Sequence, residues 1–406
     1  MTVLLAPYGS RGDVQPLIAF GKALIARGHR VRFVAPAEAV HTVTSHGLPC
    51  GSNGVDLQAA LHDAGGDLGV VWQWMLRNRI VPKLVDAVAA AADRADVVVS
   101  AGFPFAAPSV AAALDIPHVY CGWSPAHLAF GHSARARAGS AVLATALNSG
   151  RTHLGLPAID DPMRHVLGPL TFLAADPELA PLPADAPAGV VQTGAWSLPD
   201  RAPIEPALAA FLARGAPPVY VGFGSMVPRR SHAVAMEVLG AARLVRCRLV
   251  LSGGWAHLAD RQSASEHIAV IGSVAHDTLF PRVAAAIHHG GSGTTTTAAR
   301  AGIPQVLVPH TLDQHYFARR TEALGISPAS VAVEQMTADA LAVRLRAALF
   351  DTAMQQRARD LGARVAARDG AAAAVEHLER VYGSTPSPPG AAAALTATLQ
   401  ARGRPD

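Results

Sequence analysis

Short apolar runs alternate with helical patterns from the first residues of the chain. Residues 2–6 have the pattern of a buried strand, residues 9–12 form a glycine-rich turn, and the following residues place Leu17 and Leu24 on one side of a helix. A second apolar run occupies residues 31–35. A strand, a turn, a helix and a second strand in about 35 residues predict a βαβ unit, from which parallel sheets are built.

The same alternation returns after a proline-rich stretch at residues 176–218, which we interpret as the linker between two domains. Short apolar runs on either side of it predict further strands at 97–100, 117–121, 219–223, 249–252, 270–272, 284–288 and 305–309. Helical patterns lie between these runs, and the last pattern predicts one helix over residues 354–381. We therefore expect an α/β protein with two doubly wound Rossmann-like domains that face each other across a cleft.

The chain of 406 residues is long enough for two such domains. The first is expected to span residues 1–200 and the second residues 201–382, with the final helix able to pack back on the first domain. Residues 383–406 are rich in Ser, Thr, Pro, Gly and Ala and have no apolar periodicity. We expect them to form a disordered tail.

Composition and charge exclude several classes of function. The net charge is +4 and the arginines are scattered, without the basic stripe and interleaved aromatic residues that nucleic-acid binding requires. The three cysteines are far apart and form no Cys-x-x-Cys, so neither a disulfide framework nor a zinc site is expected. No nucleic-acid partner is predicted, and a reducing cytoplasm is the expected location.

No targeting or membrane-spanning segment is apparent. The apolar start at residues 2–6 is too short for a signal peptide, and no run of about 18 uncharged apolar residues occurs. Arg77 and Lys83 lie near Trp72 and Trp74 in the sequence, as a membrane-contacting helix would require. A solvated helix face explains them better than a membrane surface or an acidic acceptor, so peripheral membrane contact is not predicted.

The turn at residues 288–295, His-His-Gly-Gly-Ser-Gly-Thr-Thr, joins a strand to a helix and is suited to bind a diphosphate. Helix N-termini present unpaired N–H groups and partial positive charge, and glycines let the backbone approach a phosphate closely. Thr294 and Thr295 add hydroxyl donors, and a histidine ring adds another. Alternation along the strand points His288 and His289 to opposite faces, so His288 is expected to pack under the sheet.

This turn, the Ala-Arg-Ala-Gly-x-Pro-Gln segment at 299–305 and Asp313-Gln314 together resemble the donor signature of a large glycosyltransferase family with the GT-B fold. The chain is similar to its bacterial natural-product branch, which includes the vancomycin-group glycopeptide glycosyltransferases, and to sterol and glycolipid glycosyltransferases. The resemblance extends over nearly the whole chain. Further matching segments are Ala-Trp-x-Leu-Pro-Asp at 195–200 and Val-Tyr-Val-Gly-Phe-Gly-Ser at 219–225.

The resemblance implies a set of donor-binding residues. His289, Gly293, Thr294 and Thr295 would contact the diphosphate, with Ser225 on its other side. Val274 would pair with the nucleobase through its backbone, while Asp313 and Gln314 would bind the sugar hydroxyls. The remaining donor-binding candidates are Ser10, Arg11, Gly12, Trp255 and Gly291. His310 and His315 flank Asp313, but loop histidines are commonly only solvated.

Asp13 stands at the start of the first helix, where an Asp normally serves as a helix cap. In the family this position holds the general base, so the resemblance implies that Asp13 takes the proton of the acceptor hydroxyl as the sugar inverts. No Asp-x-Asp metal motif occurs. The enzyme is therefore expected to use a nucleotide-sugar co-substrate and no metal or other cofactor.

The acceptor pocket is expected in the irregular, aromatic-bearing inserts of the first domain. Its candidate residues are Trp72, Met75, Phe103, Trp123 and His127. Apolar and aromatic linings favour a hydrophobic acceptor such as a polyketide, macrolide, sterol or lipid. The donor is expected to be a UDP-hexose or a TDP-deoxysugar, with a slight preference for UDP-glucose because Asp313 and Gln314 suit a fully hydroxylated sugar.

Several alternatives share parts of this pattern. A sterol or glycolipid glycosyltransferase would have the same motifs, and a GT-B-fold UDP-sugar 2-epimerase would share the donor site but need no acceptor pocket. A degenerate homologue would be expected to lack the base or the phosphate turn. A nicotinamide oxidoreductase would have Gly-x-Gly-x-x-Gly after the first strand, whereas residues 9–12 are Gly-Ser-Arg-Gly, and Glu38 comes too late to bind a ribose.

Overall fold

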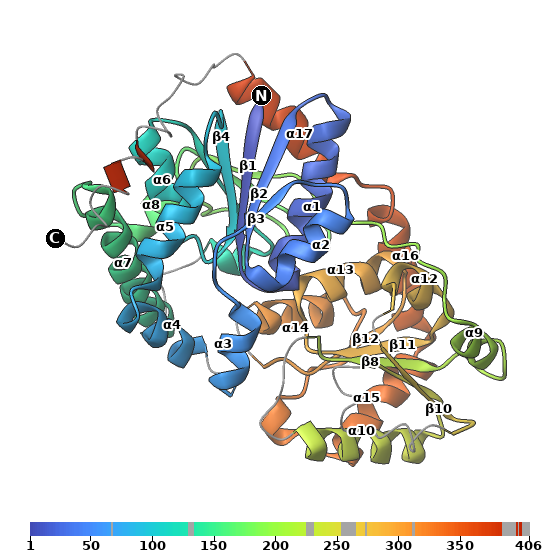
Figure 1. Ribbon diagram of the computed structural model, residues 1–406. Coiled ribbons are helices and arrows are strands. Elements are labelled where there is room, and N and C mark those ends of the chain that lie inside the picture. Colours follow the sequence, from blue (N-terminus) through green and yellow to red (C-terminus); the bar gives the residue numbers. More distant parts are fainter. Residues whose placement is uncertain are drawn as a thin grey trace. The chain divides into compact units, whose positions relative to one another are not determined.

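The computed structural model describes residues 1–65, 68–128, 134–224, 231–252, 265–272, 274–310, 313–383, 395–396 and 398–399. The chain forms two compact units (Figure 1). Unit 1 comprises Met1–Ala175, Leu182–Leu198 and Asp369–Asp406, and unit 2 comprises Asp176–Pro181 and Pro199–Arg368. The predicted disordered tail at 383–406 lies almost entirely outside the described residues.

Unit 1 contains a parallel sheet with helices on both faces (Figure 1). Its strands, in the spatial order β3-β2-β1-β4-β5-β6-β7, are β1 (Thr2–Tyr8), β2 (Arg30–Ala35), β3 (Cys50–Ser52), β4 (Val97–Gly102), β5 (His118–Gly122), β6 (Leu170–Leu173) and β7 (Val190–Gln192). Its helices are α1 (Arg11–Ala26), α2 (Val40–Ser45), α3 (Leu57–Asp63), α4 (Leu68–Arg77), α5 (Ile80–Ala91), α6 (Ala107–Leu114), α7 (Ala134–Leu154), α8 (Pro162–Leu167) and α17 (Gly370–Tyr382). The strand order reverses between β1 and β4, so the carboxyl ends of these strands border the crevice where such folds bind ligands.

Alternation along β1 divides the core of unit 1 between the two faces of the sheet. Val3 and Leu5 pack with α1 and α17 on one face, whereas Leu4 and Ala6 pack with α5 on the other. Every residue of β1 is buried, as expected for a parallel strand covered on both sides.

The C-terminal helix α17 belongs to unit 1. Gly370 begins the helix against the backbone of Gly194, where a Cβ would overlap the carbonyl of that residue. Asp369 caps the helix by accepting a hydrogen bond from Ala372 N–H at 2.9 Å. The prediction of one helix over 354–381 is therefore wrong. The chain forms α16 (Thr352–Val365) and then starts α17 anew, because Asp369 and this close backbone contact begin a second helix.

Unit 2 contains a second parallel sheet, of order β10-β9-β8-β11-β12. Its strands are β8 (Val219–Gly222), β9 (Leu249–Ser252), β10 (Ile268–Ile271), β11 (Ala285–His288) and β12 (Gln305–Leu307). Its helices include α9 (Pro206–Leu212), α10 (Ser231–Val245), α12 (His276–Leu279), α13 (Ser292–Arg300), α14 (Gln314–Ala323), α15 (Ala338–Phe350) and α16. The expectation of two parallel-sheet α/β domains is confirmed.

The proline-rich stretch predicted as a linker contains more structure than expected. Its segment 190–192 is the edge strand β7 of unit 1, paired with β6. Its segment Asp176–Pro181, hereafter the strap, belongs to unit 2 although both of its neighbours in the chain belong to unit 1. Short apolar runs between prolines did not reveal either feature, because pairing with β6 and packing on unit 2 are both long-range contacts.

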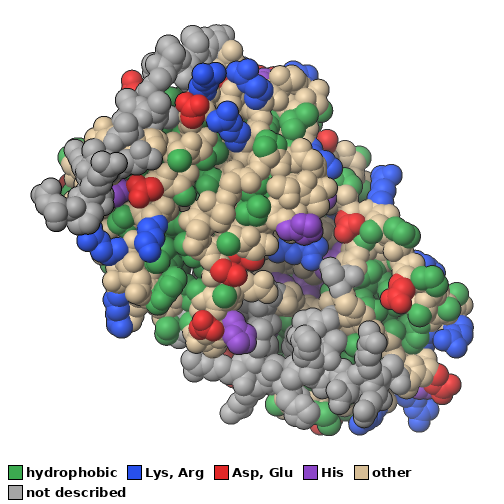
Figure 2. Space-filling model, in the orientation of Figure 1, with side chains coloured by type: hydrophobic (Ala, Val, Ile, Leu, Met, Phe, Trp, Pro, Cys, Tyr) green, Lys and Arg blue, Asp and Glu red, His purple; other side chains and the backbone are tan. Residues whose placement is uncertain are grey.

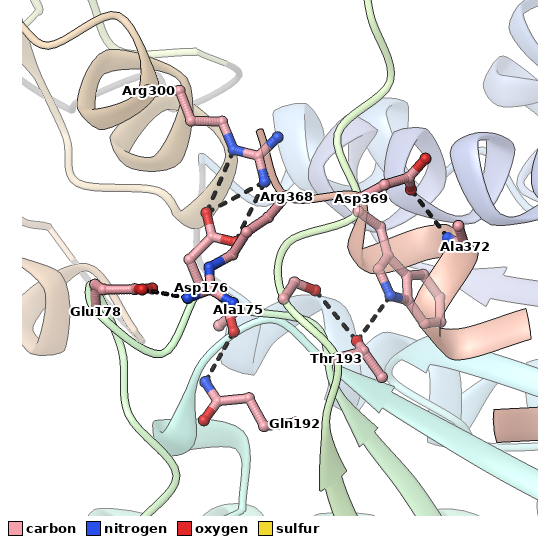
Figure 3. Close-up of polar contacts among 11 residues, drawn as sticks. Ala175, Asp176, Glu178, Gln192, Thr193, Arg300, Arg368, Asp369 and Ala372 are labelled. Carbon is pink, nitrogen blue, oxygen red and sulfur yellow. Dashed lines mark hydrogen bonds and ion pairs between the residues drawn. The ribbon is translucent and has the colours of Figure 1, made fainter. Parts of the chain in front are cut away.

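Charged groups fix the strap to unit 2 (Figure 3). The buried carboxylate of Asp176 accepts hydrogen bonds from Arg300 Nε at 3.3 Å and Nη2 at 3.2 Å. Arg320 Nε donates to the carbonyl of Leu179 at 3.0 Å, and Arg368 pairs with Glu178. Two ion pairs and a backbone contact therefore hold this six-residue segment.

Surface composition agrees with the sequence analysis. Basic and acidic side chains are interspersed on the face shown in Figure 2. None of the helices in the described part of the chain has both the length and the apolar character needed to cross a bilayer.

Replacing Arg300 with Met should destabilise unit 2 by about 3–5 kcal/mol, because the buried Asp176 carboxylate would lose its partner. The double variant Asp176→Asn/Arg300→Met should recover part of that loss. Urea unfolding followed by circular dichroism, which reports on the helices of both units, measures both changes. Arg27→Met, which breaks the exposed ion pair with Glu379, is the matched control and should change stability far less. Equal losses in Arg300→Met and Arg27→Met would contradict the importance of the buried pair.

Candidate functional site

The turn between β1 and α1 holds Asp13 in a capping box. Ser10 is the N-cap of α1, and its hydroxyl accepts a hydrogen bond from Gly12 N–H at 3.2 Å. Ser10 N–H donates in return to Asp13 Oδ2 at 2.8 Å. The helix-cap interpretation of Asp13 is therefore confirmed, and one carboxylate oxygen is fixed by the backbone of its own turn.

The second carboxylate oxygen of Asp13 meets a residue that follows β5. The indole N–H of Trp123 donates to Asp13 Oδ1 at 2.9 Å. Trp123 is buried, whereas Asp13 is only half-buried. The carboxylate thus lies at the carboxyl ends of β1 and β5, and each of its oxygens accepts a hydrogen bond from a described residue.

Two glycines make room for this carboxylate. A Cβ at Gly9 would overlap the Asp13 carboxylate itself. Gly102, at the end of β4, has φ +75°, and a Cβ there would overlap the carbonyl of Tyr8 and lie 3.2 Å from Asp13 Cγ. Glycine is the residue that tolerates both the positive φ and the close approach.

Arg11 and Gly12 lie beside Asp13 but on the exposed side of the turn. With the Gln15 carboxamide oriented to satisfy both groups, its oxygen accepts two hydrogen bonds from the Arg11 guanidinium at 3.0 Å. The Arg11 guanidinium is therefore held along the surface of α1, one turn from Gln15.

The acceptor-binding candidates fall into two groups. Trp123 hydrogen-bonds Asp13, and His127 Nδ1 accepts the backbone N–H of Trp123 at 3.1 Å. Trp72 and Phe103 pack edge to face at 5.0 Å between ring centroids and remain half-buried. Met75 is fully buried beneath them, where its sulfur accepts the Tyr8 hydroxyl at 3.3 Å.

The turn after β11 places its two histidines on opposite faces, as predicted. His288 is completely buried, with Nε2 2.8 Å from Gln305 Oε1 and Nδ1 accepting Gly290 N–H at 3.0 Å. These partners require a neutral ring protonated on Nε2. Burial, and then the neighbouring His289, lower the pKa of His288 to about 3.

Close packing explains the glycines of this turn. Gly290 has φ +88°, and a Cβ there would lie 3.1 Å from the carbonyl oxygen of Gln314. A Cβ at Gly291 would overlap the ring of His289. Both positions therefore need glycine for the turn itself, whatever ligand it binds.

The two threonines of the turn differ in what their hydroxyls can do. Thr295 is fully buried, and its hydroxyl donates to the carbonyl of Gly291 at 2.9 Å. Thr294 is half-buried in the first turn of α13. The first helical hydrogen bond runs from Thr295 N–H to Gly291 at 3.0 Å, so the N–H groups of residues 292–294 precede it and can face an anion.

His289 and His310 present buried ring nitrogens at this edge of the sheet. His289 Nδ1 and both ring nitrogens of His310 have no hydrogen-bond partner among the described residues. Burial, and then His310, lower the pKa of His289 to about 4, and burial also lowers the pKa of His310. Both rings are neutral at pH 7. The His289 ring also hydrogen-bonds the backbone of Gly222, so its Nδ1 and the two ring nitrogens of His310 are the positions open to a ligand. His310, expected to be a solvated loop histidine, instead has buried ring nitrogens, and its position just after β12 is the sequence signal for this.

Asp313 and Gln314 begin α14 close to the glycine turn. Gln314 is buried, and its Oε1 accepts the N–H of His310 at 2.8 Å. Asp313 occupies the N-cap position, yet its side chain makes no capping hydrogen bond. Asp313 thus does not cap α14 with its side chain, although an Asp at the start of a helix commonly does.

The remaining donor candidates are placed only in part. Val274 is half-buried and packs on the cluster formed by Tyr220 and Phe280. Ser225 and Trp255 lie outside the described residues.

Two family models match the chain in sequence order. Residues 3–116 match the glycosyltransferase family 28 N-terminal domain, and residues 237–381 match the erythromycin biosynthesis protein CIII-like C-terminal domain. The first match includes the Asp13 turn, and the second includes the glycine turn and Asp313-Gln314.

Curated relatives match along most of the chain. It is 39% identical over 358 residues to glycosyltransferase GtfE of Amycolatopsis orientalis, covering 81% of this chain and 86% of that protein. It is 38% identical over 405 residues to vancomycin aglycone glucosyltransferase of the same organism, covering 91% and 96%. A sterol 3-beta-glucosyltransferase of Neosartorya fischeri is 31% identical over 422 residues, covering 92% of this chain and 29% of that longer protein.

Solved structures share the fold. The glycotransferase of kitacinnamycin has a TM-score of 0.74 at 21% identity, covering 94% of this chain and 99% of the other. Glycosyltransferase VinC in complex with DTDP has a TM-score of 0.70 at 22% identity, covering 94% and 100%.

The free energy of unfolding should fall as the pH drops below 6.5. In the unfolded chain His288 then binds a proton, whereas in the folded chain its buried ring stays neutral. The loss should approach 1.4 kcal/mol per pH unit for this ring and level off near its folded pKa of about 3. Urea unfolding at pH 7.0, 6.0 and 5.0 gives the slope, and His288→Gln should reduce that slope. His62→Gln, at an exposed ring, should leave it unchanged. A slope that His288→Gln does not alter would contradict the prediction.

Proposed function

The chain belongs to the GT-B glycosyltransferases of natural-product biosynthesis, and we propose that it moves a hexose from a UDP- or TDP-sugar to a hydroxyl of an apolar natural product, with inversion. The observation that supports this most directly is the glycine turn at 288–295. It combines a helix start with the unpartnered ring nitrogens of His289 and His310. These groups suit an anion such as a diphosphate. The N–H groups and partial positive charge of a helix N-terminus attract negative charge, and the ring nitrogens lie beside them.

We infer the following donor site in unit 2. The diphosphate is bound by the N–H groups at the start of α13, by the Thr294 hydroxyl and by His289, and His310 joins this set. The sugar hydroxyls are bound by the side chains of Asp313 and Gln314, at the start of α14. Val274 pairs with the nucleobase, and Ser225 and Trp255 complete the site. Thr295 supports the turn through its bond to Gly291 rather than contacting the diphosphate.

In the proposed reaction, the acceptor hydroxyl attacks the anomeric carbon of the sugar opposite the diphosphate. A bond forms from the acceptor oxygen to that carbon as the bond to the diphosphate oxygen breaks, and Asp13 takes the hydroxyl proton. The N–H groups of α13 and the two histidines stabilise the leaving diphosphate. The proposed reaction needs no metal ion, because these fixed donors stabilise the negative charge of the leaving diphosphate.

The acceptor is proposed to bind unit 1 close to Asp13. The half-buried rings of Trp72, Phe103 and His127 are suited to contact an apolar acceptor, whereas the burial of Met75 and Trp123 restricts them to shaping the site from beneath. Sterol transfer is not favoured, because the sterol enzyme is a more distant relative than the glycopeptide enzymes. Sugar epimerisation is not favoured, because the similar curated proteins are transferases.

The function is tested with a panel of UDP- and TDP-sugars, assayed for hydrolysis and then for transfer to apolar alcohols and aglycones. Asp13→Asn should lower transfer by about 10²–10⁴-fold, because general-base catalysis is lost. Binding of the nucleoside diphosphate, measured by calorimetry, should be unchanged. Asp56→Asn is the matched control, since Asp56 also caps a helix but lies at the start of α3. Full transfer activity in Asp13→Asn would show that Asp13 is not the base.

Two neighbouring variants test the donor site. Thr294→Val should weaken binding of the nucleoside diphosphate about tenfold or more, because a hydrogen bond to a charged group is lost. Thr295→Val has the same change in shape, but its hydroxyl is directed at Gly291, so it should lower stability and leave affinity within about threefold. Equal loss of affinity in both variants would contradict the division of roles between these threonines.

A further inference from the structure

We propose that Trp123 is a positioning residue for Asp13: its indole N–H orients the carboxylate and favours the ionised form that accepts the proton. This inference rests on the proposed function, in which Asp13 is the base. The sequence analysis assigned Trp123 to the acceptor pocket, and its burial and its hydrogen bond point to a different role.

The two donors on Asp13 determine the direction of its carboxylate. Ser10 N–H holds Oδ2 at 2.8 Å and Trp123 Nε1–H holds Oδ1 at 2.9 Å. The first donor comes from the turn of Asp13 itself, so alone it fixes one oxygen and leaves the plane of the carboxylate able to rotate. The second comes from β5, across the sheet, and fixes the plane. Since a carboxylate oxygen can accept more than one hydrogen bond, an acceptor hydroxyl can still approach.

Trp123 is rigid enough for this task. Its ring packs edge to face on Trp196 at 5.9 Å between centroids, and Trp196 stacks on Phe20 at 4.4 Å with an interplanar angle of 12°. Phe20 lies on α1, the helix that begins with the Asp13 turn. The contacts therefore form a closed path from Asp13 through Trp123, Trp196 and Phe20 back to α1, so indole and carboxylate move as one body.

The hydrogen bond explains why an indole occupies position 123. A phenyl ring could pack on Trp196, but only an indole also places an N–H on the carboxylate. Trp196 in the same cluster directs its own N–H to Thr193 Oγ1 at 3.0 Å. Two indoles of one aromatic cluster thus have different hydrogen-bond partners, and Trp196 serves as the matched control.

Hydrogen bonding to an ionised carboxylate stabilises the charged form. Removing the Trp123 N–H should therefore make Asp13 easier to protonate, and the acid limb of the pH–rate profile should move to higher pH. The other titratable groups on the elements around Asp13 are Tyr8 on β1, Arg11 and Lys22 on α1, His118, Tyr120 and Cys121 on β5, and His127 after β5. β4 contributes no ionisable side chain. None of these is changed by a substitution at position 123.

The test compares Trp123→Phe with Trp196→Phe in the full chain, using kcat/KM for transfer between pH 5 and 9. Trp123→Phe should lower kcat/KM about 10- to 100-fold at the acid side and shift the acid limb upward by about one pH unit, with nucleoside diphosphate affinity unchanged. Trp196→Phe should lose activity by less than about threefold and leave the limb in place. The proposal would be overturned if the acid limb of the kcat/KM profile in Trp123→Phe lay at the wild-type pH, or if Trp196→Phe shifted it by the same amount.

A second measurement does not depend on the folding of Trp123→Phe. In ¹⁵N-tryptophan-labelled wild-type protein, one indole N–H resonance should titrate with the acid limb and move in Asp13→Asn. If no indole resonance responds to Asp13→Asn, the hydrogen bond has no role and the proposal fails. If Asp13→Asn retains full transfer activity, the proposed base fails instead, so the two failures are distinguishable.

Discussion

Parallel strands bring their carboxyl ends to one edge of a sheet, and this constraint determines where each unit can place chemistry. In unit 1 the ends of β1, β4 and β5 bring the Asp13 turn, Gly102 and Trp123 together. In unit 2 the ends of β11 and β12 bring the glycine turn and His310 together. Each site depends on close backbone approach at this edge, which is why glycines occur where a Cβ would overlap a functional side chain.

The ionisable groups at the two sites are in different environments. The Asp13 carboxylate accepts N–H donors from Ser10 and Trp123, and hydrogen bonds of this kind stabilise the ionised form of a carboxylate. The histidines of unit 2 are kept neutral by burial, which lowers the pKa of His289 to about 4. In the proposed donor site, these neutral rings would be hydrogen-bond partners of the diphosphate. The same burial makes stability depend on pH, because protonation of a buried imidazole opposes folding.

The strap shows that the boundary between the units is not a single point in the chain. Asp176–Pro181 leaves unit 1 after β6, packs on unit 2, and returns to form β7. The buried Asp176 carboxylate is bound by Arg300, the last residue of the helix that starts at the glycine turn. The helix that binds the donor in the proposed function is thus fixed at its far end by the connecting segment. Arg300 lies in the segment at 299–305 that contributes to the family resemblance.

The sequence by itself determined the features that depend on local pattern. Apolar runs and glycine turns predicted parallel α/β domains, the cap at Asp13 and the opposite orientations of His288 and His289, because strand and helix periodicity are local properties. Tertiary structure alone decided which distant groups meet. Trp123 donates to Asp13 from 110 residues away, Thr295 turns its hydroxyl inward, Met75 is buried and the strap belongs to unit 2. Such pairings depend on how elements pack, and no periodicity along the chain records the partner of a buried hydrogen-bonding group.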